Sequence, residues 1–229
     1  MKGANYRDLV VWQRSIMENE YVRKLKNAVN GNIAVYIDAA NLEQSVKDMF
    51  VRPDDISSEL KNSSAEKLKW SVDYKKLNDF FVSLGGFKGV RFYTAAFEGE
   101  GHYKFRYFLN KGLQFKLITK PLKEYEDHTL EIPHRKANFD VEIAVDATAS
   151  LDSFDTMILF SGDCDFEYLV KFFRGKGKIV IGFSRSGHVA KELPPVLSYY
   201  FDIANFRQVF MKIAQKAKNP EPFGTGLRS

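Results

Sequence analysis

The sequence predicts an α/β fold in which a mostly parallel sheet lies between helices on both of its faces. Segments typical of strands and of helices alternate from residue 33 to about residue 203, with short connections between them. Two strand segments, at 157–160 and 179–181, are apolar throughout, which is typical of strands buried on both faces. The 229 residues, 45% of them hydrophobic, are enough to bury such a sheet.

The first 31 residues are predicted to form an N-terminal helical extension. The run at 33–37 then predicts the first strand of the main domain, with Asp38 at its end. Asn30 and Gly31 separate the two elements. The helical spacing of the extension is carried by Leu9, Trp12, Ile16, Val22, Leu25 and Val29.

The later elements follow from the same two periodicities. The predicted strands are at 89–94, 113–119, 155–160, 178–183 and 199–203. The predicted helices are at 42–51, 72–84, 103–110, 140–151 and 166–173. Residues 52–66, with Pro53, two aspartates and four serines, predict a surface insertion or a mobile loop. The domain is expected to span 32–210, followed by a loose C-terminal tail at 211–229.

Charge and cysteine content narrow the class of protein. Lys and Arg total 34 against 29 Asp and Glu, a net charge of +5 that suits a polyanionic partner. Cys164 is the only cysteine, so no disulfide forms within the chain. The apolar runs are far shorter than the roughly 20 residues of a membrane-spanning helix. We therefore expect a soluble, cytoplasmic protein with no membrane partner.

Carboxylates follow two of the predicted strands. Asp38 ends the first strand, while Asp163 and Asp165 follow the strand at 155–160. Ligands of doubly wound sheets bind at the carboxyl ends of the strands, so we predict that these two strands are parallel neighbours. Asp140, at the start of a helix, supplies a fourth carboxylate. Crowded carboxylates raise one another's pKa unless a cation neutralises them, and hard divalent ions prefer such ligands.

Two simpler structural roles stay open for these residues. Asp140 is also a suitable N-cap for its helix. The segment Ser161-Gly162-Asp163 also suits an ordinary turn after a strand, although a turn needs only one of the two acids that follow Gly162.

Three segments together resemble the motif blocks of NYN domains, in the LabA-like branch of the PIN-like nuclease fold. They are 35–42, 136–146 and 161–166, in the family's order and separation. The resemblance covers about residues 32–206 and implies a Rossmann-like three-layer α/β/α domain. It also implies a metal-dependent ribonuclease that hydrolyses RNA phosphodiester bonds. Ala137 departs from the pattern, because many members have glycine there.

The resemblance further implies which residues form the site. The four aspartates would hold Mg²⁺ or Mn²⁺, whose charge activates water and neutralises the phosphate. Asp146 matches a further acidic position of the family. The implied catalytic residues are Asp38, Asn41, Asp140, Asp163 and Asp165.

Polar residues around the acids are candidates for contacts with an RNA partner. They are Arg135, Lys136, Ser161 and Arg185. The aromatic residues between 97 and 107 fit either base stacking or core packing. Self-association is left open.

Two other functions are weighed against the nuclease. One is an RNA- or protein-binding regulatory module whose pocket holds metal but turns over poorly. The other is a phosphatase of the haloacid-dehalogenase kind, which is disfavoured because Ala40 stands where that family needs a second aspartate after Asp38. The four histidines have no metal-binding spacing, which argues against zinc.

Overall fold

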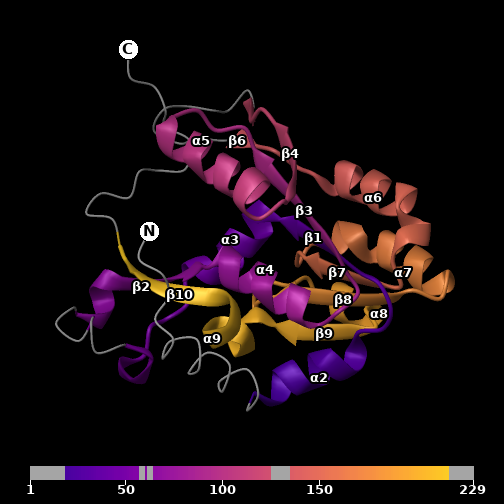
Figure 1. The fold of residues 1–229 in the computed structure, drawn as a ribbon, viewed down its shortest axis with the longest axis horizontal. Coiled ribbons are helices and arrows are strands. Elements are labelled where there is room, and N and C mark those ends of the chain that lie inside the picture. The colour runs from indigo at the N-terminus through magenta and orange to yellow at the C-terminus, as the bar shows by residue number, and fades with distance from the viewer. Residues whose placement is uncertain (1–18, 57–59, 61–63, 125–134, 217–229) are drawn as a thin grey trace.

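The computed structural model describes residues 19–56, 60, 64–124 and 135–216 (Figure 1). A six-stranded sheet runs through the described part in the order β4-β3-β1-β7-β8-β9. All five pairings in this sheet are parallel. The strands are β1 (Ile33–Asp38), β3 (Phe87–Ala95), β4 (Lys116–Lys120), β7 (Thr156–Phe160), β8 (Ile179–Ser184) and β9 (Tyr199–Asp202).

The register of the two central strands brings their carboxyl ends together. Ile37 of β1 is opposite Phe160 of β7, so Asp38 and Ser161 leave the sheet side by side. The expected neighbouring position of these two parallel strands is therefore confirmed.

Helices cover both faces of the sheet, which confirms the three-layer α/β architecture. Side chains of β1 alternate between two cores: Val35 and Ile37 face one, while Ala34 and Tyr36 face the other. The first core is covered by α2 (Glu20–Ala28), α3 (Ala39–Lys47), α4 (Tyr74–Ser83) and α9 (Arg207–Phe210). The second core is covered by α6 (Asp140–Ala149), α7 (Glu167–Gly175) and α8 (Leu193–Val196).

Shorter elements complete the described chain. Helix α5 (Glu100–Tyr107) continues into one π-helical turn at Phe108–Gly112. Two small antiparallel sheets pair β5 (Lys123–Glu124) with β6 (Arg135–Lys136), and β2 (Leu68–Val72) with β10 (Met211–Gln215). Single 3₁₀ turns lie at Pro53–Asp55, Ala65–Lys67, Leu151–Ser153, Cys164–Phe166 and Ile203–Phe206.

The β2–β10 pairing corrects two expectations. The helix expected from residue 72 begins at Tyr74, capped by Asp73, because Leu68, Trp70 and Val72 alternate into the core as a strand. The tail expected from residue 211 begins instead with β10, whose Met211 is buried. The folded part of the chain thus continues beyond the predicted boundary at 210.

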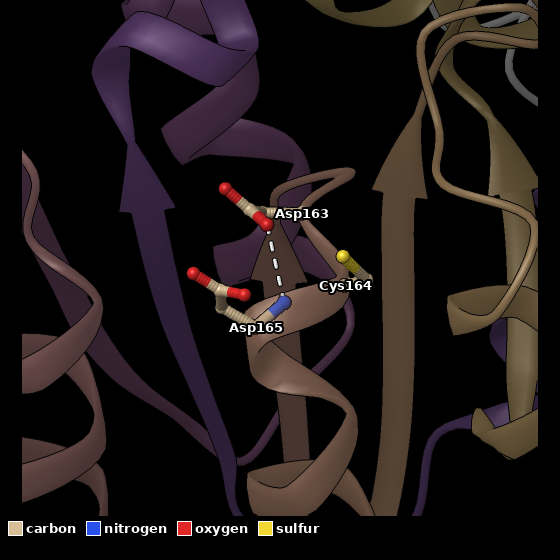
Figure 2. Close-up of side chains that lie close together, drawn as sticks. All are labelled: Asp163, Cys164 and Asp165. Carbon is tan, nitrogen blue, oxygen red and sulfur yellow. Dashed lines mark hydrogen bonds between the residues drawn. The ribbon is translucent and has the colours of Figure 1, made fainter.

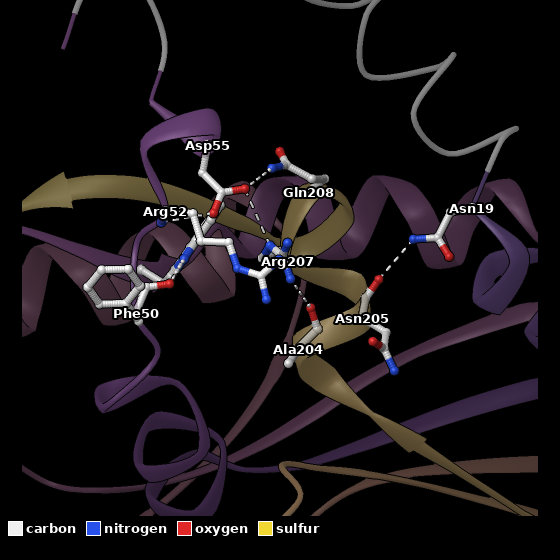
Figure 3. Close-up of polar contacts among 9 residues, drawn as sticks. Asn19, Phe50, Arg52, Asp55, Ala204, Asn205, Arg207 and Gln208 are labelled. Carbon is white, nitrogen blue, oxygen red and sulfur yellow. Dashed lines mark hydrogen bonds and ion pairs between the residues drawn. The ribbon is translucent and has the colours of Figure 1, made fainter. Parts of the chain in front are cut away.

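The start of the predicted insertion at 52–66 is fixed to the body of the domain (Figure 3). The Asp55 side chain is 8% exposed and pairs with Arg207 at 3.4 Å. It also accepts hydrogen bonds from Gln208 Nε2 and from the Arg52 backbone N–H, both at 3.1 Å. For residues 52–56 the prediction of a mobile loop is therefore wrong, because α9 holds this segment. The extension is held nearby, where Asn19 Nδ2 donates to the Asn205 carbonyl at 2.8 Å.

Replacing Asp55 with alanine should destabilise the domain, because the Arg52 N–H, the Gln208 amide and the Arg207 charge lose their acceptor. We expect the free energy of unfolding to fall by about 1–2 kcal/mol in chemical denaturation. Asp54→Ala is the matched control, since Asp54 is exposed on the same turn and should change stability by less than about 0.5 kcal/mol. Equal effects of the two substitutions would contradict the proposed anchor.

Candidate functional site

Asp38 ends β1 and begins α3. Its Oδ1 accepts hydrogen bonds from the backbone N–H groups of Ala40 at 3.1 Å and Asn41 at 3.3 Å. Because this cap is present, α3 begins at Ala39, three residues before the predicted start at 42. The side chain of Asp38 is therefore fixed at the carboxyl edge of the sheet, where it is 7% exposed.

Asn41 joins the ends of the two central strands. Its Nδ2 donates to Asp38 Oδ2 at 2.9 Å, and its Oδ1 accepts from the Gly162 N–H at 3.2 Å. One amide therefore connects the end of β1 with the loop after β7. Asn41, one of the catalytic residues that the resemblance implies, therefore orients the Asp38 carboxylate.

Gly162 lies where two loops approach closely. A Cβ at this position would lie 2.6 Å from Ser184 Oγ and 2.7 Å from the His188 carbonyl oxygen. The Gly162 carbonyl also accepts a hydrogen bond from the Ala190 N–H at 2.9 Å. Gly162 thus does more than form a turn, because it lets the loop after β8 pack against the loop after β7.

The acids after Gly162 are held by their own backbone. Asp163 Oδ1 accepts from the Asp165 N–H at 3.1 Å, and the Asp163 N–H donates to Ser161 Oγ at 3.2 Å. Ser161 is only 2% exposed. Ser161 Oγ thus helps to hold the loop, and its expected contact with RNA stays a prediction.

Asp163, Cys164 and Asp165 form the closest group of metal-ligand atoms in the described chain. One ligand atom from each lies within 4.8 Å of the other two. Figure 2 shows the two carboxylates extending to one side of the loop, with the sulfur on the other side. Burial and the negative charges of Asp163 and Asp165 raise the pKa of the Cys164 thiol, which keeps it protonated and a poor ligand.

Asp140 is the first residue of α6, and Phe139 rather than Asp140 occupies the N-cap position. Its N–H donates to Asn138 Oδ1 at 2.9 Å, so the predicted capping role falls to another residue. Burial raises the pKa of the Asp140 carboxyl, and the charges of Asp163, Asp38 and Asp165 raise it further, while Asn138 opposes them. The carboxylate of Asp140 therefore lies within electrostatic range of the other three acids.

Asp38 belongs to the same electrostatic group. Burial is the main cause that raises its pKa, and Asp163 adds to it, against the hydrogen bonds from Asn41 and Ala40. No ion pair among the described side chains involves Asp38, Asp140, Asp163 or Asp165. Four mutually repelling oxygen donors that pair with no described cationic side chain fit a hard divalent ion.

Asp146 lies apart from this group. Its Oδ2 accepts from the Tyr93 hydroxyl at 2.9 Å, which fixes α6 to β3. Arg135 and Lys136 form β6 through their backbone, and their side chains lie outside the described part of the chain.

Arg185 follows β8 on the loop that packs against Gly162. Its side chain is half-buried, and Nη1 is buried without a hydrogen-bond partner among the described residues. A guanidinium in this position retains a donor for an anion.

The aromatic residues between 97 and 107 divide between the two expected roles. Phe105 packs against Tyr74 and Phe92, at ring-centroid distances of 5.5 and 6.4 Å. Tyr103 and Tyr107 are 62% and 58% exposed, so only part of this set serves the core.

Glu43 was not recognised from the sequence. Burial raises the pKa of its carboxyl to about 7, Lys69 opposes this shift, and Asp38 adds to it. Glu43 lies on α3, which begins after Asp38 and packs against β2. Its position on α3, five residues after Asp38, gave no sign of burial beside another acid.

Comparison with known proteins places the chain in a family. The NYN domain model matches residues 32–204. The chain is 29% identical over 161 residues to the low amplitude and bright protein LabA of Synechococcus elongatus, covering 69% of this chain and 84% of that protein. A crystal structure of a protein of unknown function from Vibrio parahaemolyticus has the same fold, with a TM-score of 0.56 and 19% identity, over 80% of this chain and 96% of that one.

No helix in the described residues is long and apolar enough to cross a membrane. The match of the NYN domain model covers most of the chain and all four aspartates of the acid group. This chain belongs to the NYN domain family of PIN-like nucleases.

Proposed function

We propose that the protein is a metal-dependent ribonuclease that hydrolyses RNA phosphodiester bonds through Asp38, Asp140, Asp163 and Asp165. The observation that carries this proposal is the position of Asp38 beside the loop of Asp163 and Asp165, which Asn41 joins to it at the carboxyl edge of the sheet. The charges of all three acids also act on Asp140. Family membership supports a nuclease, since the match includes all four positions.

The acid group fits Mg²⁺ or Mn²⁺, which prefer carboxylate oxygens. When bound, such an ion supplies positive charge that activates water and neutralises the phosphodiester. Asp38 already accepts three hydrogen bonds, but an ionised carboxylate has about four acceptor directions, so one remains for a ligand.

The other polar residues would position the substrate. Asn41 keeps Asp38 turned toward Gly162, and the free donor of Arg185 would hold a phosphate. Arg135 and Lys136, just before α6, are proposed as further contacts with the RNA backbone.

One observation favours the regulatory module as the second candidate function. Asp38 and Asp140 are not part of the close group formed by Asp163, Cys164 and Asp165. A pocket that holds an ion only through that loop would bind metal without efficient hydrolysis. Metal and cleavage measurements separate the two functions.

Asp163→Asn should weaken Mn²⁺ binding by at least about tenfold, because it removes a charged ligand while an asparagine oxygen can still accept from the Asp165 N–H. Isothermal titration calorimetry measures this affinity. Cys164→Ala is the control and should leave the affinity unchanged, because a hard ion does not use the thiol as a ligand. If both substitutions weaken binding equally, the ion is held by the group of Asp163, Cys164 and Asp165. If Asp163→Asn leaves the affinity unchanged, the acids have a structural role.

Asp165→Asn and Asp140→Asn should each lower the rate of RNA cleavage by about 100-fold or more, the scale expected for losing one electrostatic partner of a transition state. RNA affinity measured in chelator should change little, because cations hold the backbone. Asp152→Asn removes the same charge from an exposed turn and should cleave RNA like the wild type. If the metal-loaded wild type cleaves no faster than Asp165→Asn, the nuclease proposal fails and the regulatory module replaces it.

The metal-free protein should lose stability as pH rises from about 4.5 to about 7. Glu43 has a pKa near 7 in the folded state against an ordinary value of 4.5, so the folded state binds more protons in this interval. The raised pKa values of Asp38 and Asp140 act in the same direction. Melting temperatures in chelator should therefore fall with pH, and Glu43→Gln should flatten the curve. Glu98→Gln, at an exposed position, serves as control and should leave the curve unchanged. A wild-type melting temperature that rises between about pH 4.5 and about pH 7 would contradict the account.

A further inference from the structure

The small sheet β2–β10 has one apolar and one basic face. Leu68, Trp70, Val72 and Met211 are buried against the first core. Successive side chains of a strand point to opposite faces, so the residues between them point outward. Lys69 and Lys212 are two of these outward residues, and both are exposed.

The strand register brings four lysines onto the outward face. Ser71 is opposite Lys212, and Lys69 is opposite Ala214. The Lys216 N–H donates to the Lys67 carbonyl at 2.8 Å, which holds these two exposed lysines together just beyond the end of the strand pair. The basic face therefore consists of Lys67, Lys69, Lys212 and Lys216, with Ser71 and Ala214 between them.

This basic face contains no carboxylate of its own. No ion pair among the described side chains involves any of its four lysines. Like charges held close together repel one another, and the backbone hydrogen bond between Lys216 and Lys67 holds two lysines close. A partner that supplies negative charges along the face would relieve this repulsion.

The basic face lies on the strand pair that packs against α3, the helix that Asp38 caps. Figure 1 shows β2 and β10 side by side next to α3. A polyanion lying on the lysines would therefore be held beside the helix that carries Asp38 at its start.

We propose that the basic face of β2–β10 binds the phosphate backbone of the RNA whose cleavage is proposed above. This inference rests on the proposed function for its choice of polyanion. Lysine ammonium groups that contact phosphates carry no sequence information, so the face would hold RNA of any sequence.

The test compares two variants that each lose four positive charges. The first carries Lys67→Gln, Lys69→Gln, Lys212→Gln and Lys216→Gln. The control carries Lys24→Gln, Lys26→Gln, Lys88→Gln and Lys176→Gln, at exposed positions outside the face. Fluorescence anisotropy measures the binding of a short labelled single-stranded RNA in chelator, between about 50 and 200 mM salt. Unchanged melting temperatures show that both variants are folded.

The first variant should lose at least about tenfold in affinity, and the slope of its salt dependence should fall by roughly 2–3, at about 0.7 for each phosphate contact on a single strand. The control should bind like the wild type, and a variant with arginine at the four positions should keep its affinity. Equal losses in both glutamine variants, no loss in either, or no RNA binding by the wild type would overturn the proposal. So would a preference of the lysine face for vesicles containing phosphatidylserine over RNA.

Because chelator prevents metal-dependent turnover, this result is independent of cleavage. If RNA binding depends on the lysines but no cleavage is detected, the proposal that the basic face binds RNA is supported and the nuclease proposal is contradicted. If the protein cleaves RNA but its RNA affinity does not depend on the four lysines, only the proposal that the basic face binds RNA is overturned.

Discussion

The amide of Asn41 connects two segments that lie more than a hundred residues apart, and the geometry of the acid group depends on it. The backbone N–H of Gly162 can only donate, so Asn41 must turn its oxygen toward Gly162 and its nitrogen toward Asp38. Asp38 must then present an acceptor oxygen. This chain of donors and acceptors fixes the orientation of Asp38 and holds the loop of Asp163 beside it.

The site is stabilised by the layers beneath it rather than by its own contacts. Burial and mutual repulsion both oppose ionisation of Asp38 and Asp140, so the metal-free acid group costs folding free energy. Directly below, Phe160 of β7 stacks on Phe183 of β8 at 4.9 Å, and Phe183 stacks on Phe201 at 5.5 Å. Apolar packing of this kind lets a domain retain a strained polar site at the edge of its sheet.

The parallel sheet and the acids at its edge could be predicted from the sequence, because periodicity marks strands and Asp38 and Asp163 directly follow two of them. The β2–β10 pair could not be predicted from the sequence, because its two strands are far apart in the chain. Each strand also mixes lysines with apolar residues over only a few positions. Periodicity shows which way a side chain faces but not what lies opposite it. For this reason the burial of Glu43 and of Ser161, and the cap of α6 at Phe139, appeared only in three dimensions.

The central claim is that carboxylates from β1, from the loop after β7 and from α6 hold one divalent site. Anomalous scattering from crystals soaked in Mn²⁺ tests it most directly. The account predicts a manganese peak within about 2.0–2.3 Å of oxygens from both Asp38 and Asp163. A peak confined to the loop of Asp163, Cys164 and Asp165, or no peak at the acid group, would contradict it.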